Sequence, residues 1–143
     1  MTGFSAYNIY QDGLGQMSVR IRVRNILMVL AGVAGLLLKS WFAESLGDFA
    51  FSYLGNLSVS FAVYFIVSIA ASPKLNRLMI SISALLIVEI FELTDGFGVM
   101  TNVYDPFDYF ANALGVALAY GVDVVSTHLL RARSDNQDRG DAA

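Results

Sequence analysis

Four long apolar runs are the main constraint on how this chain of 143 residues can fold. A helix that crosses a bilayer needs about 20 mostly apolar residues, because each residue adds about 1.5 Å to its length. Only 15% of the residues are charged and 56% are hydrophobic, more apolar surface than a water-soluble domain of this length can bury. We therefore predict an all-α membrane protein, a four-helix transmembrane bundle. Its spans are expected at about residues 25–42, 49 or 52 to 71, 78–93 and 106–130.

The basic residues lie almost entirely on one side of the predicted spans. Cytoplasmic segments of membrane proteins carry an excess of Lys and Arg. Of the nine Lys and Arg residues, only Lys39 lies at the opposite end of a span. This distribution predicts cytoplasmic N- and C-termini and a multi-pass protein of the bacterial cytoplasmic (inner) membrane. The residues on the basic side are Arg20, Arg22, Arg24, Lys74, Arg77, Arg131, Arg133 and Arg139.

The chain divides into three parts by composition. Residues 1–24 form a polar N-terminal segment with a basic membrane flank, residues 25–130 the transmembrane domain, and residues 131–143 a polar cytoplasmic tail. The absence of cysteine excludes a disulfide framework and Cys-based metal sites, and one histidine excludes a His-rich metal cluster. The arginines before the first span are interpreted as a membrane flank, so no nucleic-acid partner is expected.

Acidic residues accumulate in the second half of the chain. Ionisable groups inside a span cost about 2.5–3.5 kcal/mol each on insertion scales unless they are paired, protonated or hydrated. Lys39 is the only candidate counter-ion at the outer end. Asp123 lies towards the cytoplasmic end, where we expect it to pair with arginines. Between Arg77 and Arg131 there is no Lys or Arg, but there are Glu89, Glu92, Asp95, Asp105, Asp108 and Asp123.

The spacing of these residues places several on shared helix faces. Glu89 and Glu92 are three positions apart and share one face of the third span. Asp108, Asn112 and Gly115 stand at i, i+4 and i+7 and share one face of the fourth. Because the two spans run antiparallel, we expect Glu89, Glu92, Asp108 and Asn112 to meet just beneath the outer surface.

Such a cluster is compatible with several kinds of chemistry. Carboxylates with an amide can ligate a hard divalent cation, receive a cationic or hydroxyl-rich headgroup, or share a proton. They can also form a hydrogen-bonded network that only joins the two helices. No metal-ligand signature or nucleophile stands out, so no catalytic residue is assigned and no cofactor is expected, with a divalent cation left open. Ala111, Gly115 and Ala119 add a small-residue ridge that lets a neighbouring helix approach closely.

The pattern Glu89-x-x-Glu92 followed by Asp108-x-x-x-Asn112-x-x-Gly115 resembles the VanZ-like family of small bacterial integral membrane proteins. The resemblance covers residues 88 to 123. That family typically has Gln where this chain has Glu92, and it often carries an Arg in the loop before the last helix, where this chain has none. The resemblance implies a role in the cell envelope, and through the family's namesake a link to teicoplanin sensitivity, without a defined reaction.

The first hypothesis from the sequence is therefore a polar pocket near the outer face that binds an envelope lipid or lipid-linked glycan headgroup. The alternatives are an accessory subunit of a larger membrane complex or a homo-oligomer, a metal-dependent membrane-lipid enzyme, and a small proton- or cation-coupled transporter. The residues expected to line the pocket are Glu89, Glu92, Asp108, Asn112 and Gly115, with Asp95 and Asp105 at its mouth.

Overall fold

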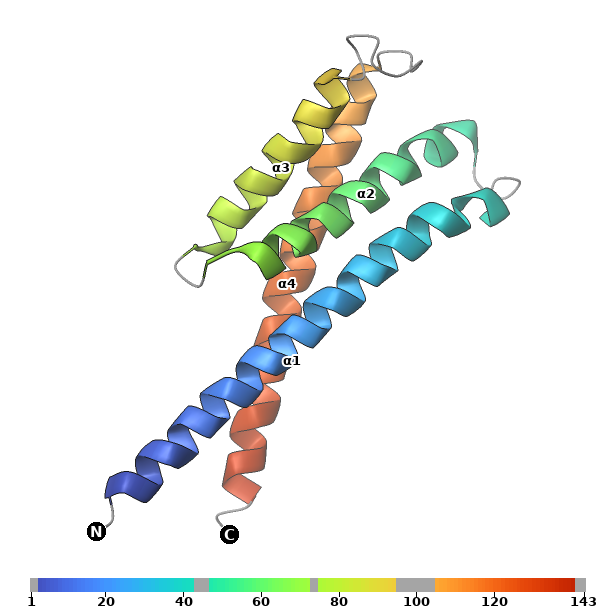
Figure 1. The fold of residues 1–143 in the computed structure, drawn as a ribbon. Helices are drawn as coiled ribbons and strands as arrows, with labels where there is room; N and C mark the ends of the chain where they lie inside the picture. The colour runs from blue at the N-terminus through green and yellow to red at the C-terminus, as the bar shows by residue number, and fades with distance from the viewer. Residues whose placement is uncertain (1–2, 43–46, 73–74, 95–104, 141–143) are drawn as a thin grey trace.

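The computed structural model describes residues 3–42, 47–72, 75–94 and 105–140. Within these ranges the chain is helical and contains no strand. The α-helices are α1 (Gly3–Leu38), α2 (Asp48–Ala70), α3 (Arg77–Thr94) and α4 (Pro106–Gly140), and the short 3₁₀ helix η1 (Lys39–Phe42) continues α1 (Figure 1). The prediction of an all-helical fold is confirmed.

Three of these helices are long and apolar enough to cross a membrane. The qualifying segments are Ser18–Leu38, Tyr53–Ala70 and Pro106–Arg133. Helix α3 is 18 residues long and carries three ionisable residues, Arg77, Glu89 and Glu92, which lower its apolar character. Length and composition therefore support three of the four predicted spans.

The helix ends follow from local chemistry. Helix α2 stops before Ser72-Pro73, and the Ala71 N–H still bonds the Val67 carbonyl at 2.8 Å. At the start of α3 the Asn76 side chain accepts the Met79 N–H at 2.9 Å, which satisfies one of the free amides of the first turn. Helices α1 and α4 extend beyond the predicted spans, so residues 3–24 and 131–140 are helical and continue them.

Helix α2 is the centre of the bundle, because it packs against α1, α3 and α4, and α3 also packs against α4. Small residues set these close approaches. A Cβ on Gly32 of α1 would stand 2.9 Å from the Ala62 Cβ, and one on Gly115 of α4 would stand 2.5 Å from the Leu57 carbonyl oxygen. Gly115 of the predicted small-residue ridge thus packs against α2 of the same chain, and Ala111 and Ala119 are buried as well.

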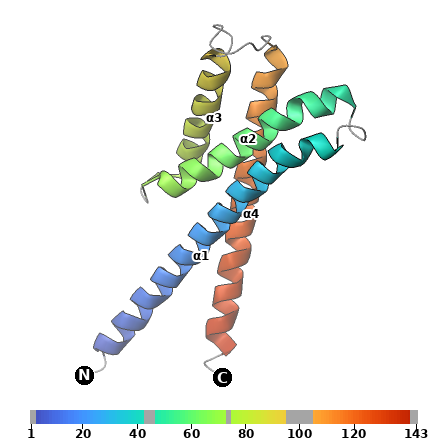
Figure 2. The ribbon, with the colours of Figure 1, turned by 45° about the vertical axis from the view of Figure 1, so that its right-hand side comes forward.

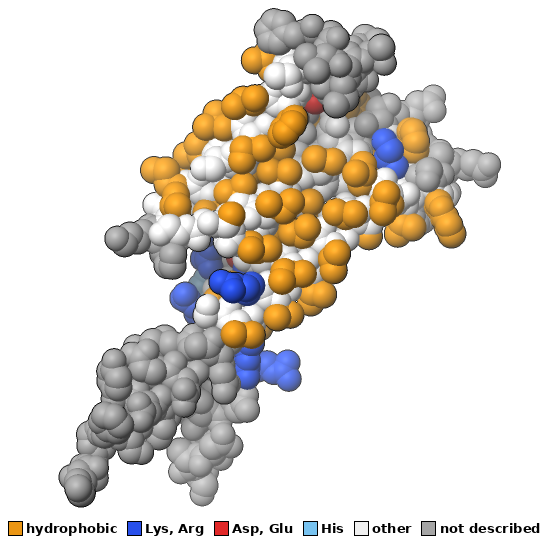
Figure 3. All heavy atoms as spheres, in the orientation of Figure 1, with side chains coloured by type: hydrophobic (Ala, Val, Ile, Leu, Met, Phe, Trp, Pro, Cys, Tyr) orange, Lys and Arg blue, Asp and Glu red, His pale blue; other side chains and the backbone are white. Residues whose placement is uncertain are grey.

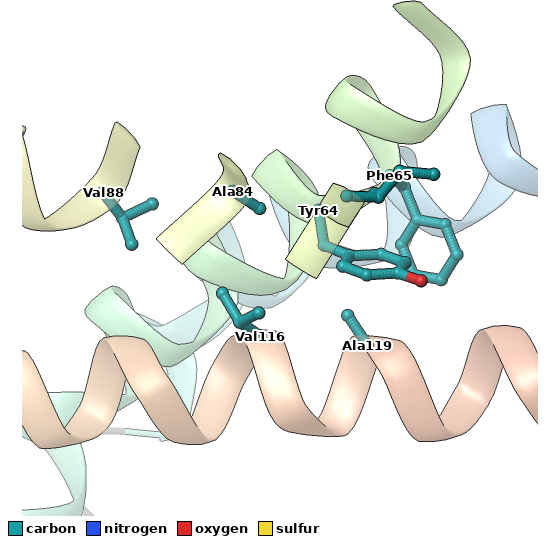
Figure 4. Packing of buried hydrophobic residues seen from close by; sticks show 7 residues of the cluster. Tyr64, Phe65, Ala84, Val88, Val116 and Ala119 are labelled. Carbon is teal, nitrogen blue, oxygen red and sulfur yellow. The ribbon is translucent and has the colours of Figure 1, made fainter. Parts of the chain in front are cut away.

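The side chains are distributed as expected for a protein whose solvent is lipid. Large hydrophobic residues are exposed on all four helices, for example Leu30, Ile66, Leu86 and Phe110, and they cover much of the described face in Figure 3. A surface this apolar is not stable against water. The buried apolar cluster is small and joins α2, α3 and α4 (Figure 4). It consists of Tyr64, Phe65, Ile80, Ala84, Val88, Val116 and Ala119.

Candidate functional site

Asp108 and Asn112, two of the predicted site residues, both bond to α2. The Asn56 amide donates to Asp108 Oδ1 at 2.6 Å, and the Ser60 hydroxyl donates to Asn112 Oδ1 at 2.7 Å. In both pairs the α4 residue comes 52 positions after its partner, so the two helices run parallel in a constant register. Asn112 and Ser60 are buried. The sequence analysis placed these side chains against the third span and missed their partners on α2.

Asp105, predicted at the mouth of the pocket, caps the start of α4. Its Oδ1 accepts the Phe107 N–H at 2.9 Å, and its Oδ2 accepts the Tyr53 hydroxyl at 2.6 Å. The hydrogen bond from Tyr53, followed by that from Phe107, holds the pKa of the Asp105 carboxyl below its usual range. A carboxylate is also favoured at a helix N-terminus by the helix dipole. Asp95 lies outside the described residues.

Helix α3 brings Glu92 to Asp108. The two side chains are hydrogen-bonded to each other. The predicted meeting of α3 and α4 acids is therefore present for this pair, and we refer to Glu89, Glu92, Asp108 and Asn112 as the acidic cluster.

Glu89 is the member of the acidic cluster with a buried oxygen that has no hydrogen-bond partner. Its Oε2 is the only buried side-chain oxygen or nitrogen without a hydrogen-bond partner among the residues that the structure describes. Glu89 lies about one helical turn beyond Glu92, at the level of Asn112 in the antiparallel pairing of α3 with α4. An unsatisfied buried acceptor costs about 1–3 kcal/mol, so its presence calls for a reason.

A second polar cluster forms around Asp123 near the other end of α2. Asp123 Oδ1 accepts a hydrogen bond from Arg24 Nη2, and Oδ2 accepts one from Arg77 Nε at 2.7 Å. The Tyr64 hydroxyl also donates to Oδ2, at 3.2 Å. The predicted pairing of Asp123 with arginines is confirmed. We call these residues, with Thr127, the arginine cluster; it links all four α-helices.

Arg24 uses its whole guanidinium within this cluster. Nη1 donates to the Thr127 and Ser126 hydroxyls at 2.6 and 2.9 Å, and Nε donates to the Asn25 side chain at 3.1 Å. The sequence analysis treated Arg24 as part of the membrane flank. A signal for its role was available in Asp123 and Thr127, which are four positions apart on one face of an apolar helix.

Two ion pairs join described residues in the arginine cluster. Both ion pairs found there involve Asp123. Lys39, the candidate counter-ion from the sequence, lies over the Phe51 ring with its Nζ 5.1 Å from the ring centre. The described residues contain no group of three His, Cys, Asp or Glu side chains arranged to hold a metal ion.

Comparison with protein-family models, with curated proteins and with solved structures gives no match for this chain. The VanZ-like resemblance stays a prediction that rests on residues 88 to 123. The two clusters differ in their chemistry: charges are paired in the arginine cluster, whereas the acidic cluster offers acidic groups and one unused acceptor.

Proposed function

We propose that this chain is a VanZ-like multi-pass protein of the bacterial inner membrane, with α3 as its fourth span and both termini in the cytoplasm. The N- and C-terminal ends lie at the same end of the molecule (Figures 1 and 2). Two ionisable side chains of α3 have hydrogen-bond partners on α4, since Arg77 bonds Asp123 and Glu92 bonds Asp108. That pairing reduces the cost of placing α3 in a bilayer.

We further propose that the acidic cluster binds an envelope lipid or lipid-linked glycan through a headgroup that carries hydroxyl or ammonium groups. The observation that carries this proposal is the buried, unpartnered Oε2 of Glu89, which lies near the hydrogen-bonded pair Glu92 and Asp108. Carboxylates accept hydrogen bonds and attract cations, whereas they repel phosphate. A hydroxyl or ammonium donor would satisfy Glu89 without a further protein group.

The residues of the predicted pocket would have different roles. Asp108 and Asn112 are anchored to α2, so they would shape the site and hold α3 in place through Glu92. Gly115 would act only through helix packing, because it lies against the α2 backbone. The contact with the headgroup would then fall to Glu89, supported by Glu92.

Native mass spectrometry of the full chain extracted from its membrane tests this proposal. Glu89→Gln keeps the shape of the side chain but removes its charge, so a discrete lipid adduct of the wild type should be lost. Thr94→Ala is the matched control, because the exposed Thr94 hydroxyl bonds only its own helix, at the Phe91 carbonyl. Equal lipid adducts in all three folded proteins would contradict the proposal and would identify the cluster as a joint between helices.

The family resemblance extends the proposal to glycopeptide sensitivity. Cells that produce the wild type should tolerate more teicoplanin than cells that produce equal amounts of Glu89→Gln. Equal tolerance at equal membrane abundance would separate the envelope phenotype from the acidic cluster.

A further inference from the structure

An apolar groove opens between α1 and α2 on the side of the bundle near the arginine cluster. The two helices are in close contact where Gly32 meets Ala62. From that point they diverge towards the C-terminal end of α2 (Figures 1 and 2). The groove has a volume of about 280 Å³. It is lined by Ile26, Val29, Leu30, Ile66, Ile69 and Ala70.

A basic residue lies one helical turn from the lining of this groove. Arg22 precedes Ile26 by four residues, so it lies on the same face of α1, one turn closer to the N-terminus. Arg22 is exposed, and none of the described acidic side chains pairs with it. Arg24, in contrast, is buried. Its guanidinium donates hydrogen bonds to Asp123, Ser126, Thr127 and Asn25. The aliphatic lining is thus followed along α1 by a guanidinium that no described acidic side chain pairs.

We propose that this groove binds one acyl chain of an anionic glycerophospholipid whose phosphate is held by Arg22. Aliphatic walls match an acyl chain, and the planar guanidinium matches a phosphate through paired hydrogen bonds. Anionic lipids are also attracted to basic residues next to a span. This site goes beyond the headgroup site proposed above: it lies towards the other end of α2, and it selects the opposite charge.

The headgroup half of the proposal is tested by titrating the purified full chain with dioleoyl phosphatidylglycerol or dioleoyl phosphatidylcholine and counting bound lipids by native mass spectrometry. The two lipids have the same acyl chains, so any difference in affinity between them arises from the headgroup. The wild type should prefer phosphatidylglycerol by about fivefold, and Arg22→Gln should abolish that preference. Arg20→Gln removes the same charge about 200° around the helix and should retain it.

The acyl-chain half is tested by filling the groove. Ala70→Phe places a ring between the helices and should weaken the binding of both lipids severalfold. Ile82→Phe on α3 is the matched control, because Ile82 is exposed but lies outside the groove, and it should bind lipid as the wild type does.

Three results would overturn the assignment. One is equal affinity of the wild type for the two lipids. Another is an equal effect of Arg22→Gln and Arg20→Gln on the preference. The third is equal lipid binding by Ala70→Phe and Ile82→Phe. Glu89→Gln separates this inference from the proposed function, because any phosphatidylglycerol bound at the acidic cluster would be lost in this variant, whereas the part of the binding that depends on Arg22 should remain.

Discussion

Gly115 and Leu57 bring the backbones of α4 and α2 into contact, since a Cβ at position 115 would stand 2.5 Å from the Leu57 carbonyl oxygen. The same Cβ would stand 2.9 Å from the Cβ of Ser60, the residue that bonds Asn112. Asp108 and Asn112 bond the same helix. The motif Asp-x-x-x-Asn-x-x-Gly therefore has a clear physical meaning in this chain: it is the stripe of α4 that meets α2.

Gly115→Ala is expected to lower the free energy of unfolding by about 1–3 kcal/mol, because the added methyl group forces the two helices apart. Unfolding of the detergent-purified chain, followed by circular dichroism, measures this. Gly121→Ala is the matched control on the same helix, because nothing lies within 4 Å of a Cβ at that position. It should leave stability unchanged or raise it by up to about 1 kcal/mol. Equal effects of the two variants would contradict the packing role of Gly115.

The two arginines of the arginine cluster should respond differently to replacement by lysine. Arg24 is buried and bonds Asp123, Ser126 and Thr127 at once, which a single ammonium group cannot reproduce. Arg24→Lys is therefore expected to cost about 1–3 kcal/mol of stability, the range for buried groups left without a partner. Arg77 is part exposed and uses one nitrogen, so Arg77→Lys should cost less than about 1 kcal/mol. Chemical unfolding of both variants compares them, and a larger loss in Arg77→Lys would refute this division of roles.

The positions of the helices could be predicted from the sequence, because the features that indicate them are local. The lengths of the apolar runs located the helices, and Pro73 and Pro106 marked an end and a beginning that the structure reproduces to within a few residues. The pairing of Asp123 was also accessible, since a carboxylate in a span near many arginines has few alternatives.

The partners on α2 could not be predicted, because their signal depends on the packing of distant segments. Tyr53, Asn56, Ser60 and Tyr64 recur every three or four positions on one face of α2, but uncharged polar residues are ordinary in membrane helices. Only the packing of α2 against α4 shows what they bond. The first three bond residues 52 positions later, and Tyr64 bonds Asp123, 59 positions later. Arg24 was missed for a similar reason, because its partner Asp123 lies 99 positions later in the chain.

The cap of α4 should make stability depend on pH. The Tyr53 and Phe107 hydrogen bonds lower the pKa of Asp105 in the folded state, so they stabilise the fold when the carboxyl is charged. This contribution is complete above the ordinary Asp pKa of about 3.9 and is lost as the pH falls through the lower folded value. Tyr53→Phe removes the larger cause, so the stability gap between wild type and variant should be widest near neutral pH and should narrow as the pH is lowered. Thermal unfolding across a pH series measures the gap, and a constant gap would exclude the titration of Asp105 as its origin.

Glu89 and Glu92 stand one turn apart on α3, yet substitution by leucine should change stability in opposite directions. Glu89→Leu removes a buried oxygen that has no partner and should raise the free energy of unfolding by about 1–3 kcal/mol. Glu92→Leu removes the hydrogen bond to Asp108 and should lower it by about 1 kcal/mol. The free energies of unfolding of the wild type and the two variants, measured in the same detergent, test this prediction. A stabilising Glu89→Leu would mean that the chain keeps a carboxylate its own fold does not need, as expected for a ligand-binding group. A destabilising one would mean that Glu89 holds the helices together, and the headgroup proposal would lose its main support.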